Sequence, residues 1–151
     1  MPYLAKQMLD SIPYDPDALQ ATCEDLGLRL VLAFGSRAGG VPTASEISDL
    51  DLAVLDSEPV SWNRFADIRS RLSRIFDAVE VDLVFLKHAD PLFRYEIFRS
   101  AKPLFGDLDL YAAQKAFAYK AYVDSADLRR LERVLFKKKL ALIDREIHAS
   151  S

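Results

Sequence analysis

The chain has 151 residues, half of them hydrophobic and 28% charged, with a formal net charge of −3 and a pI near 5.4. This profile excludes a disordered chain, and the length suits one domain with a single core. The acidic balance argues against a general nucleic-acid binder, because contacts to phosphates require a basic face.

Cysteine usage and hydropathy indicate the compartment. The single cysteine, Cys23, excludes an internal disulfide, which fits a reducing environment. No apolar run approaches the ~20 residues that a membrane span requires, and the N-terminus lacks the charged-then-apolar plan of a signal peptide. We therefore expect a cytoplasmic protein without a membrane anchor.

The first clear elements are a helix and a strand. Asp15 suits the N-cap position of a helix, with Pro16 at the first helical position and Gly27 at its end. A nearly continuous apolar run over residues 28–34 then predicts a buried strand. Because this run stops at Gly35, a turn is expected at the carboxyl end of the strand.

The turn itself has the composition of a phosphate-binding loop, Gly35-Ser36-Arg37-Ala38-Gly39-Gly40. Glycine tolerates positive φ and close backbone approach, and successive backbone N–H groups can form an anion-binding concavity that the Ser36 hydroxyl joins. Arg37 is a further candidate, because its forked donors match a phosphate. Residues 38–48 are rich in turn formers and predict a loop that can fold over a ligand.

A second strand, expected from about Asp49 to Leu55, carries paired acidic residues. Side-chain alternation places Asp49 and Asp51 on one face of the sheet and the intervening apolar residues on the other. Like charges held this close repel one another unless a hard divalent cation such as Mg²⁺ binds their oxygens. Asp49 and Asp51 are therefore candidate metal ligands.

A third carboxylate follows in a later strand. Helical spacing over residues 61–77 predicts an amphipathic helix, and the β-branched run from Val79 to Leu86 predicts a third strand. Asp82 lies within this otherwise apolar strand, where a carboxylate is costly unless it is paired or bound to a metal.

The remaining residues are expected to be helical. Asp90 and Pro91 begin a weakly helical stretch that we expect to reach Phe105, before Gly106. No glycine or proline follows, which predicts one helix to about residue 123 and another from about residue 126. The apolar face of the last helix is wide, so we expect it to pack against both the domain and something else. Its basic residues 137–139 are read as a solvated face and not as a nucleic-acid patch.

The order of Gly35-Ser36, Asp49-x-Asp51 and Asp82 resembles the nucleotidyltransferase superfamily that includes polymerase-β-like enzymes. The strings Gly-Ser-Arg-Ala-Gly-Gly and Ser-Asp-Leu-Asp-Leu-Ala-Val are similar to those of minimal nucleotidyltransferases (MNT), the antitoxins paired with HEPN toxins. Residues 93–105 are also similar to this group. The resemblance implies an α/β (α+β) nucleotidyltransferase fold, with a small mixed sheet flanked by helices over residues 1–106. It leaves residues 107–151 as a helical extension that packs on this core, on a partner or on both.

The resemblance also implies roles for the residues. Gly35 and Ser36 would hold the triphosphate of ATP, while Asp49 and Asp51 bind metal ions and Asp82 completes one metal site and helps to deprotonate the attacking hydroxyl. The implied activity is transfer of AMP from ATP to a tyrosine of a HEPN ribonuclease toxin, which silences the toxin within a hetero-oligomer. The spacer between Ser36 and Asp49 is slightly longer than the commonest form of the motif, and Gly39 stands where the family often has an arginine.

Two other functions remain open from the sequence. One is a small-molecule nucleotidyltransferase of the aminoglycoside-modifying type, although such enzymes usually add a larger substrate domain for which the residues after Gly106 leave little room. The other is a non-catalytic antitoxin that blocks its partner through the wide apolar face of the last helix. The turn lacks the motifs of a P-loop and of a dinucleotide-binding fold.

Overall fold

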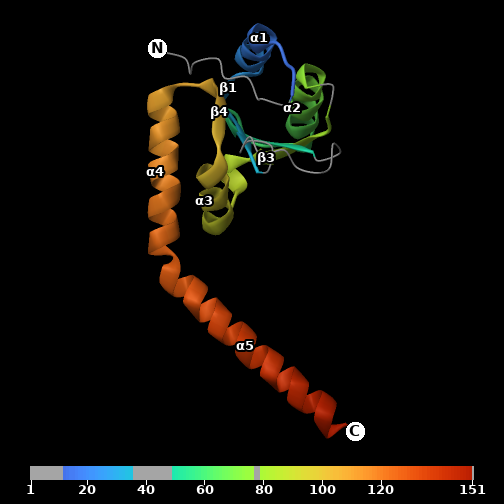
Figure 1. The fold of residues 1–151 in the computed structure, drawn as a ribbon, viewed down its shortest axis with the longest axis vertical. Helices are drawn as coiled ribbons and strands as arrows, with labels where there is room; N and C mark the ends of the chain where they lie inside the picture. Colours follow the sequence, from blue (N-terminus) through green and yellow to red (C-terminus); the bar gives the residue numbers. More distant parts are fainter. Residues whose placement is uncertain (1–11, 36–48, 77–78, 151) are drawn as a thin grey trace.

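The computed structural model describes residues 12–35, 49–76 and 79–150 (Figure 1). Its sheet has the strand order β3–β2–β1–β4, in which β1 runs antiparallel to β2 and β4, and β2 runs parallel to β3. The strands are β1 (Leu28–Phe34), β2 (Leu50–Asp56), β3 (Val81–Phe85) and β4 (Lys102–Gly106). The helices are α1 (Pro16–Leu26), α2 (Trp62–Ile75), α3 (Pro91–Ser100), α4 (Leu108–Asp124) and α5 (Ala126–Ala149), with a short 3-10 helix, η1 (Leu86–His88).

The sheet separates two hydrophobic clusters, one on each face. Helices α1 and α2 cover the first face, where Cys23 and Ile68 pack with Val31 of β1. Helices α3 and α4 cover the second face, where Ile97 and Ala118 pack with the remaining inward-facing sheet residues. The molecule is therefore an α+β domain with a small mixed sheet flanked by helices, as the sequence predicted.

The predicted helix starts are confirmed by their capping contacts. The Asp15 carboxylate accepts a hydrogen bond from the backbone N–H of Asp17 at 2.9 Å, and α1 ends at Gly27. The Asp90 carboxylate accepts from the backbone N–H of Phe93 at 2.8 Å. The strand over residues 28–34 and the two helices after residue 107 also lie where they were expected.

The expectation of one helix from Pro91 to Phe105 was wrong. Helix α3 ends at Ser100, and residues from Lys102 onward form strand β4. Proline lacks an N–H group and is accepted in a sheet only at an edge or a bulge. Strand β4 is an edge strand, and its register with β1 shifts beside Pro103, so both conditions are met.

Helix α5 leaves the domain as a long arm (Figure 1). Helix α4 runs alongside α3, whereas α5 continues at an angle from the end of α4 and buries none of its residues. The expected packing of the last helix on the domain is therefore not observed. No helix in the described part of the chain is long and apolar enough to cross a membrane.

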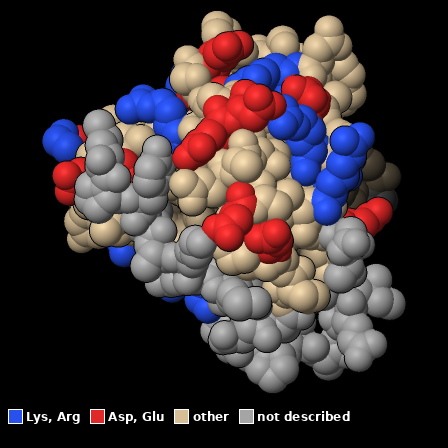
Figure 2. All heavy atoms as spheres, turned by 90° about the horizontal axis from the view of Figure 1, so that it is seen from above, with Lys and Arg blue, Asp and Glu red and all other residues tan. Residues whose placement is uncertain are grey.

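Charged side chains of both signs share the face of the domain that Figure 2 shows. Acidic and basic residues adjoin one another there, and neither sign covers the whole face.

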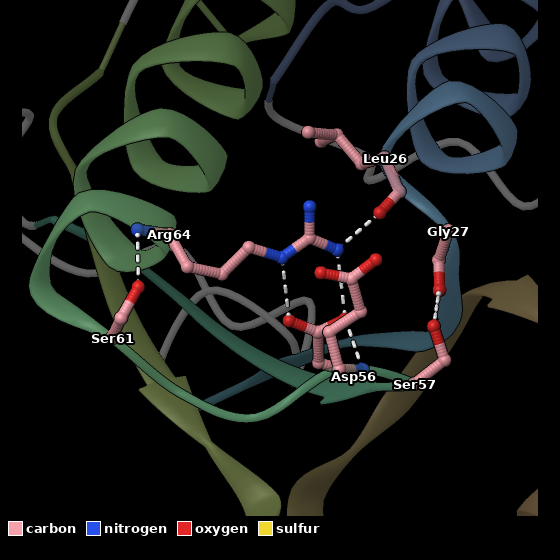
Figure 3. Close-up of polar contacts among 7 residues, drawn as sticks. Leu26, Gly27, Asp56, Ser57, Ser61 and Arg64 are labelled. Carbon is pink, nitrogen blue, oxygen red and sulfur yellow. Dashed lines mark hydrogen bonds and ion pairs between the residues drawn. The ribbon is translucent and has the colours of Figure 1, made fainter.

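One buried ion pair joins three elements on the first face of the sheet (Figure 3). Asp56, the last residue of β2, is 1% exposed and accepts two hydrogen bonds at 2.8 Å from the guanidinium of Arg64, in the first turn of α2. Arg64 also donates to the carbonyl of Leu26, the last residue of α1. The Ser57 hydroxyl adds a hydrogen bond to the Gly27 carbonyl at 2.8 Å. The pair thus holds the end of α1 and the start of α2 against the end of β2.

Replacing Arg64 with alanine is expected to lower the free energy of unfolding by about 3–5 kcal/mol, because it leaves a buried carboxylate without its partner. Urea unfolding at neutral pH measures this change. The matched control is Arg71→Ala, which breaks an ion pair to Asp25 whose side chains are 32% and 69% exposed and which should cost less than about 1 kcal/mol. Equal losses in the two variants would show that the Asp56 pair does not anchor the helices.

The same pair predicts a pH signature. Burial raises the pKa of Asp56, but hydrogen bonds from Arg64 and from two backbone N–H groups outweigh it and bring that pKa below its ordinary value of 3.8. The ionised carboxylate therefore stabilises the fold above that value, and the contribution is lost as the pH falls through the folded-state pKa. The stability difference between wild type and Arg64→Ala should narrow between about pH 5 and pH 2. A stability difference between wild type and Arg64→Ala that does not change with pH would contradict a lowered pKa of Asp56.

Candidate active site

Three strands meet at one edge of the sheet. Because β1 is antiparallel to β2, the carboxyl end of β1 lies beside the amino end of β2, and β3 begins at the same edge. Phe34 pairs with Asp51, and Asp51 in turn pairs with Asp82. Asp49 lies immediately before β2. The edge therefore gathers the three aspartates that are separated along the sequence.

Asp51 and Asp82 lie on the same face of the sheet. Their chain neighbours Leu50, Leu52 and Leu83 all pack in the cluster beneath α1 and α2. Side-chain alternation then directs both aspartates to the side covered by α3 and α4. Paired residues on adjacent strands lie about 5 Å apart, so the two carboxylates are neighbours. Asp51 is half-buried, whereas Asp49 and Asp82 are exposed.

The pKa of Asp51 reflects the short distances between the acidic groups at this edge. Burial raises the pKa of Asp51, and the negative charges of Asp82 and Asp49 raise it further. Each of these contributions disfavours the charged form of the Asp51 carboxyl. A divalent cation bound among the carboxylates would reverse this penalty, and oxygen-rich acidic sets are the ligands that Mg²⁺ prefers.

Gly35 is in direct contact with this acidic group. It has a φ of +80°, and a Cβ placed on it would lie 2.6 Å from Oδ2 of Asp51. Both the backbone conformation and the contact disfavour a larger side chain. The turn that follows β1 therefore lies in contact with the Asp51 carboxylate.

Ser100 holds the same turn from the other side. The backbone N–H of Gly35 donates a hydrogen bond of 3.1 Å to the hydroxyl oxygen of Ser100, at the end of α3. An edge-to-face contact between Phe34 and Phe93, with ring centroids 6.0 Å apart, packs α3 against the end of β1. No sequence pattern identifies Ser100, because a single serine 65 residues from the glycine turn carries no motif.

Some predicted site residues remain predictions. Ser36 and Arg37 lie outside the described residues, so the structure does not describe the phosphate contacts expected of them and of Gly35. Within residues 12–35, 49–76 and 79–150, no three histidine, cysteine, aspartate or glutamate side chains converge into a metal-binding cluster. The chemistry of the donor set fits Mg²⁺, but coordination by the three aspartates stays a prediction.

The family of the chain follows from its sequence match. A profile of the family described as polymerase beta, nucleotidyltransferase matches residues 18–109, which contain the four strands together with Gly35, Asp49, Asp51 and Asp82. The match spans more than half of the chain, so the protein belongs to this nucleotidyltransferase family. The predicted superfamily is thereby confirmed. No curated protein sequence matches the chain.

Solved structures share the fold at low sequence identity. A toxin–antitoxin crystal structure with AMP-PNP contains a chain that is 21% identical, with a TM-score of 0.66 and coverage of 81% of this chain and 98% of that one. A structure of tri-AMPylated Shewanella oneidensis HEPN toxin with MNT antitoxin gives 19% identity, a TM-score of 0.61 and coverage of 80% and 95%. The toxin–antitoxin MntA–HepT crystal structure gives 18% identity, a TM-score of 0.61 and coverage of 80% and 96%. At these identities the likeness establishes the fold.

Replacing Gly35 with alanine should lower the free energy of unfolding by about 2–3 kcal/mol, because the positive φ alone costs about 1–2 kcal/mol and the Asp51 contact adds to it. Urea unfolding in two backgrounds separates the two causes. In an Asp51→Ala background the cost should fall to about 1–2 kcal/mol. In an Asp82→Ala background it should keep its full size. If Gly35→Ala lowers the free energy of unfolding equally in all backgrounds, the contact with Asp51 does not contribute to its cost.

Proposed function

We propose that this protein is an antitoxin nucleotidyltransferase that transfers AMP from ATP to a tyrosine of a cognate HEPN ribonuclease toxin and thereby neutralises the toxin. The observation that carries the proposal is the pairing of Asp51 with Asp82 beside the Gly35 turn, within a polymerase-β-like nucleotidyltransferase domain. The solved structures with this fold add support, since they include a toxin–antitoxin complex with AMP-PNP and a tri-AMPylated HEPN toxin with an MNT antitoxin.

The proposed reaction is an in-line displacement at phosphorus. The tyrosine hydroxyl oxygen attacks the α-phosphorus of ATP, a new oxygen–phosphorus bond forms, and the bond to pyrophosphate breaks. The hydroxyl proton passes to the carboxylate of Asp82, which is exposed at the edge of the sheet and so accessible to an incoming acceptor. AMP-tyrosine and pyrophosphate are the products.

The other predicted site residues position the nucleotide. The Gly35 turn, with Ser36 and Arg37, holds the triphosphate through backbone N–H groups and cationic donors. Asp49 and Asp51, with Asp82, would hold Mg²⁺. When bound, the metal supplies positive charge that offsets the charge on the attacking and leaving oxygens.

A protein acceptor fits the open character of this edge. Asp49 and Asp82 are exposed, so a loop of another protein can approach them without entering a closed pocket. We therefore favour a toxin partner in a cytoplasmic hetero-oligomer over a small-molecule substrate.

The proposal is tested by incubating the protein with its HEPN partner, ATP and Mg²⁺, then measuring the intact mass and ribonuclease activity of the toxin. We expect the mass of one or more AMP groups to be added to a tyrosine, no addition in EDTA, and recovery when Mg²⁺ is restored. Asp51→Asn and Asp82→Asn should each slow the transfer by roughly a hundredfold or more.

The control variant is Asp109→Asn, which removes an exposed carboxylate in the first turn of α4 and should leave the transfer rate unchanged. If Asp51→Asn and Asp82→Asn neutralise the toxin as well as wild type does, the protein acts by binding alone and the catalytic proposal is wrong.

A further inference from the structure

Helix α5 carries exposed apolar side chains along most of its length. It spans 24 residues, buries none of them, and lies entirely outside the segment that matches the family profile. Isolated exposed apolar residues are ordinary, but a long helix with exposed apolar side chains in rows marks an interaction site. Such a helix gains stability by packing its rows against another surface.

Most of the exposed apolar residues of α5 form two stripes, because residues three and four positions apart lie on the same face of a helix, and Val134 lies outside both. The elbow stripe, which begins near the junction with α4, consists of Leu128, Leu131, Leu135 and Leu142. The end stripe consists of Phe136, Leu140, Ile143 and Ile147, whose exposed fractions are 62%, 49%, 43% and 62%. Glu132, Lys139 and Glu146, spaced seven residues apart, form a charged row between the stripes. The spacing of the end stripe alternates between four and three residues, as in the seam of a coiled coil.

Charge is distributed unevenly along α5. Residues 126–139 contain six basic and two acidic residues, whereas residues 140–149 contain one basic and two acidic residues. The first part therefore carries a net charge of +4 and the second −1, with histidine neutral. Two parallel copies of α5 would bring Lys137, Lys138 and Lys139 of both helices level with one another, which is repulsive. Antiparallel copies would instead place the basic residues 137–139 of each helix near the acidic residues Asp144 and Glu146 of the other.

We propose that the end stripe is the seam of an antiparallel homodimer, in which α5 packs against α5 of a second copy of this chain. In this alignment Phe136 lies level with Ile147 of the second copy, and Leu140 lies level with its Ile143. Each apolar side chain of the stripe then has an apolar counterpart, so the stripe is complementary to itself under a two-fold rotation.

The residues that flank the seam support a second copy of the chain as the partner. In the same alignment Lys137 faces Asp144 of the second copy, and Lys139 faces its Glu146. Residues that flank the seam of a coiled coil choose the partner and its orientation through such pairs. Both pairs occur twice because of the symmetry, so a second copy pairs Lys137 and Lys139 with carboxylates and also covers the apolar stripe.

The interface is small, and the dimer is accordingly weak. Four partly exposed side chains from each copy bury roughly 800 Å² in total, which is below the standard size of specific interfaces and in the range of weak, transient contacts. A dissociation constant in the micromolar range is expected for a contact of this size. Because the helices are antiparallel, the two domains lie at opposite ends of the pair, away from the seam.

Sedimentation velocity of the full chain, from about 1 to 200 μM, tests the proposal across the expected range of affinity. Wild type should shift from monomer to dimer as concentration rises, and L140K/I143K should stay monomeric throughout. The matched control is L131K/L135K, which places the same charges on the elbow stripe at positions of similar exposure and should still dimerise.

A charge exchange identifies the partner as a second copy. K137E and D144K should each weaken the dimer roughly tenfold, because each one places like charges opposite each other at two symmetric positions. The double variant K137E/D144K should recover the wild-type dissociation constant, since it restores both pairs with their signs exchanged.

Several results would overturn the proposal. These are a chain that stays monomeric at every concentration, equal loss of dimer in L140K/I143K and L131K/L135K, or a charge exchange that does not restore association. A monomeric chain in which L140K/I143K abolishes capture of the HEPN toxin would assign the end stripe to that partner, and the second-copy proposal would be wrong. Sedimentation measures association without nucleotide, so its outcome is independent of the transferase proposal.

Discussion

The parallel pairing of β2 with β3 is the constraint on which the candidate site depends. Parallel neighbours cannot be joined by a tight hairpin, so the chain crosses over through α2 before β3 returns to the sheet. This crossover places Asp82 beside Asp51 although the two are far apart in the sequence. The Asp56–Arg64 pair fixes the start of the crossover, because it holds the first turn of α2 against the end of β2. A contact on the first face of the sheet therefore supports the position of carboxylates on the second face.

The candidate site is arranged at a cost to the fold. Asp51 is half-buried beside two other carboxylates, which raises its pKa and disfavours its charged form. Gly35 adopts a positive φ against the same carboxylate, and Ser100 is committed to holding the turn. Crowded like charges and the perturbed pKa values that they cause tend to cluster where function requires them. A nucleotide with its metal ions is the kind of ligand that would offset this cost, since it brings cations to the aspartates.

Local signals made much of the fold predictable from the sequence. Asp15, Asp90 and Gly27 mark helix ends through backbone geometry that one or two residues control, and the apolar runs predicted β1, β2 and β3. Side-chain alternation along β2 correctly predicted that Asp51 lies on the face opposite its apolar neighbours Leu50 and Leu52. These features depend on neighbours in the chain, which is why the sequence shows them.

The features that the sequence did not reveal depend on distant neighbours. Strand β4 was not predicted because it contains Pro103, which a sheet accepts only at an edge or a bulge, and no local pattern shows which strand lies at an edge. The Asp56–Arg64 pair and the Ser100 contact join the ends of different elements, so periodicity does not report them. For α5, the width of the apolar face indicated a partner, but the sequence alone did not show that the domain itself leaves this face uncovered.

The most direct test of the central claim measures metal binding without any chemistry. Electron paramagnetic resonance can count Mn²⁺ ions bound to the protein in the presence of AMP-PNP, with Mn²⁺ replacing Mg²⁺. If the aspartates at the sheet edge form the nucleotide–metal site, wild type should bind about two ions above those held by the free nucleotide. Asp51→Asn and Asp82→Asn should then lose at least one of them, while Asp109→Asn should lose none. Equal Mn²⁺ binding by all four proteins would contradict the account.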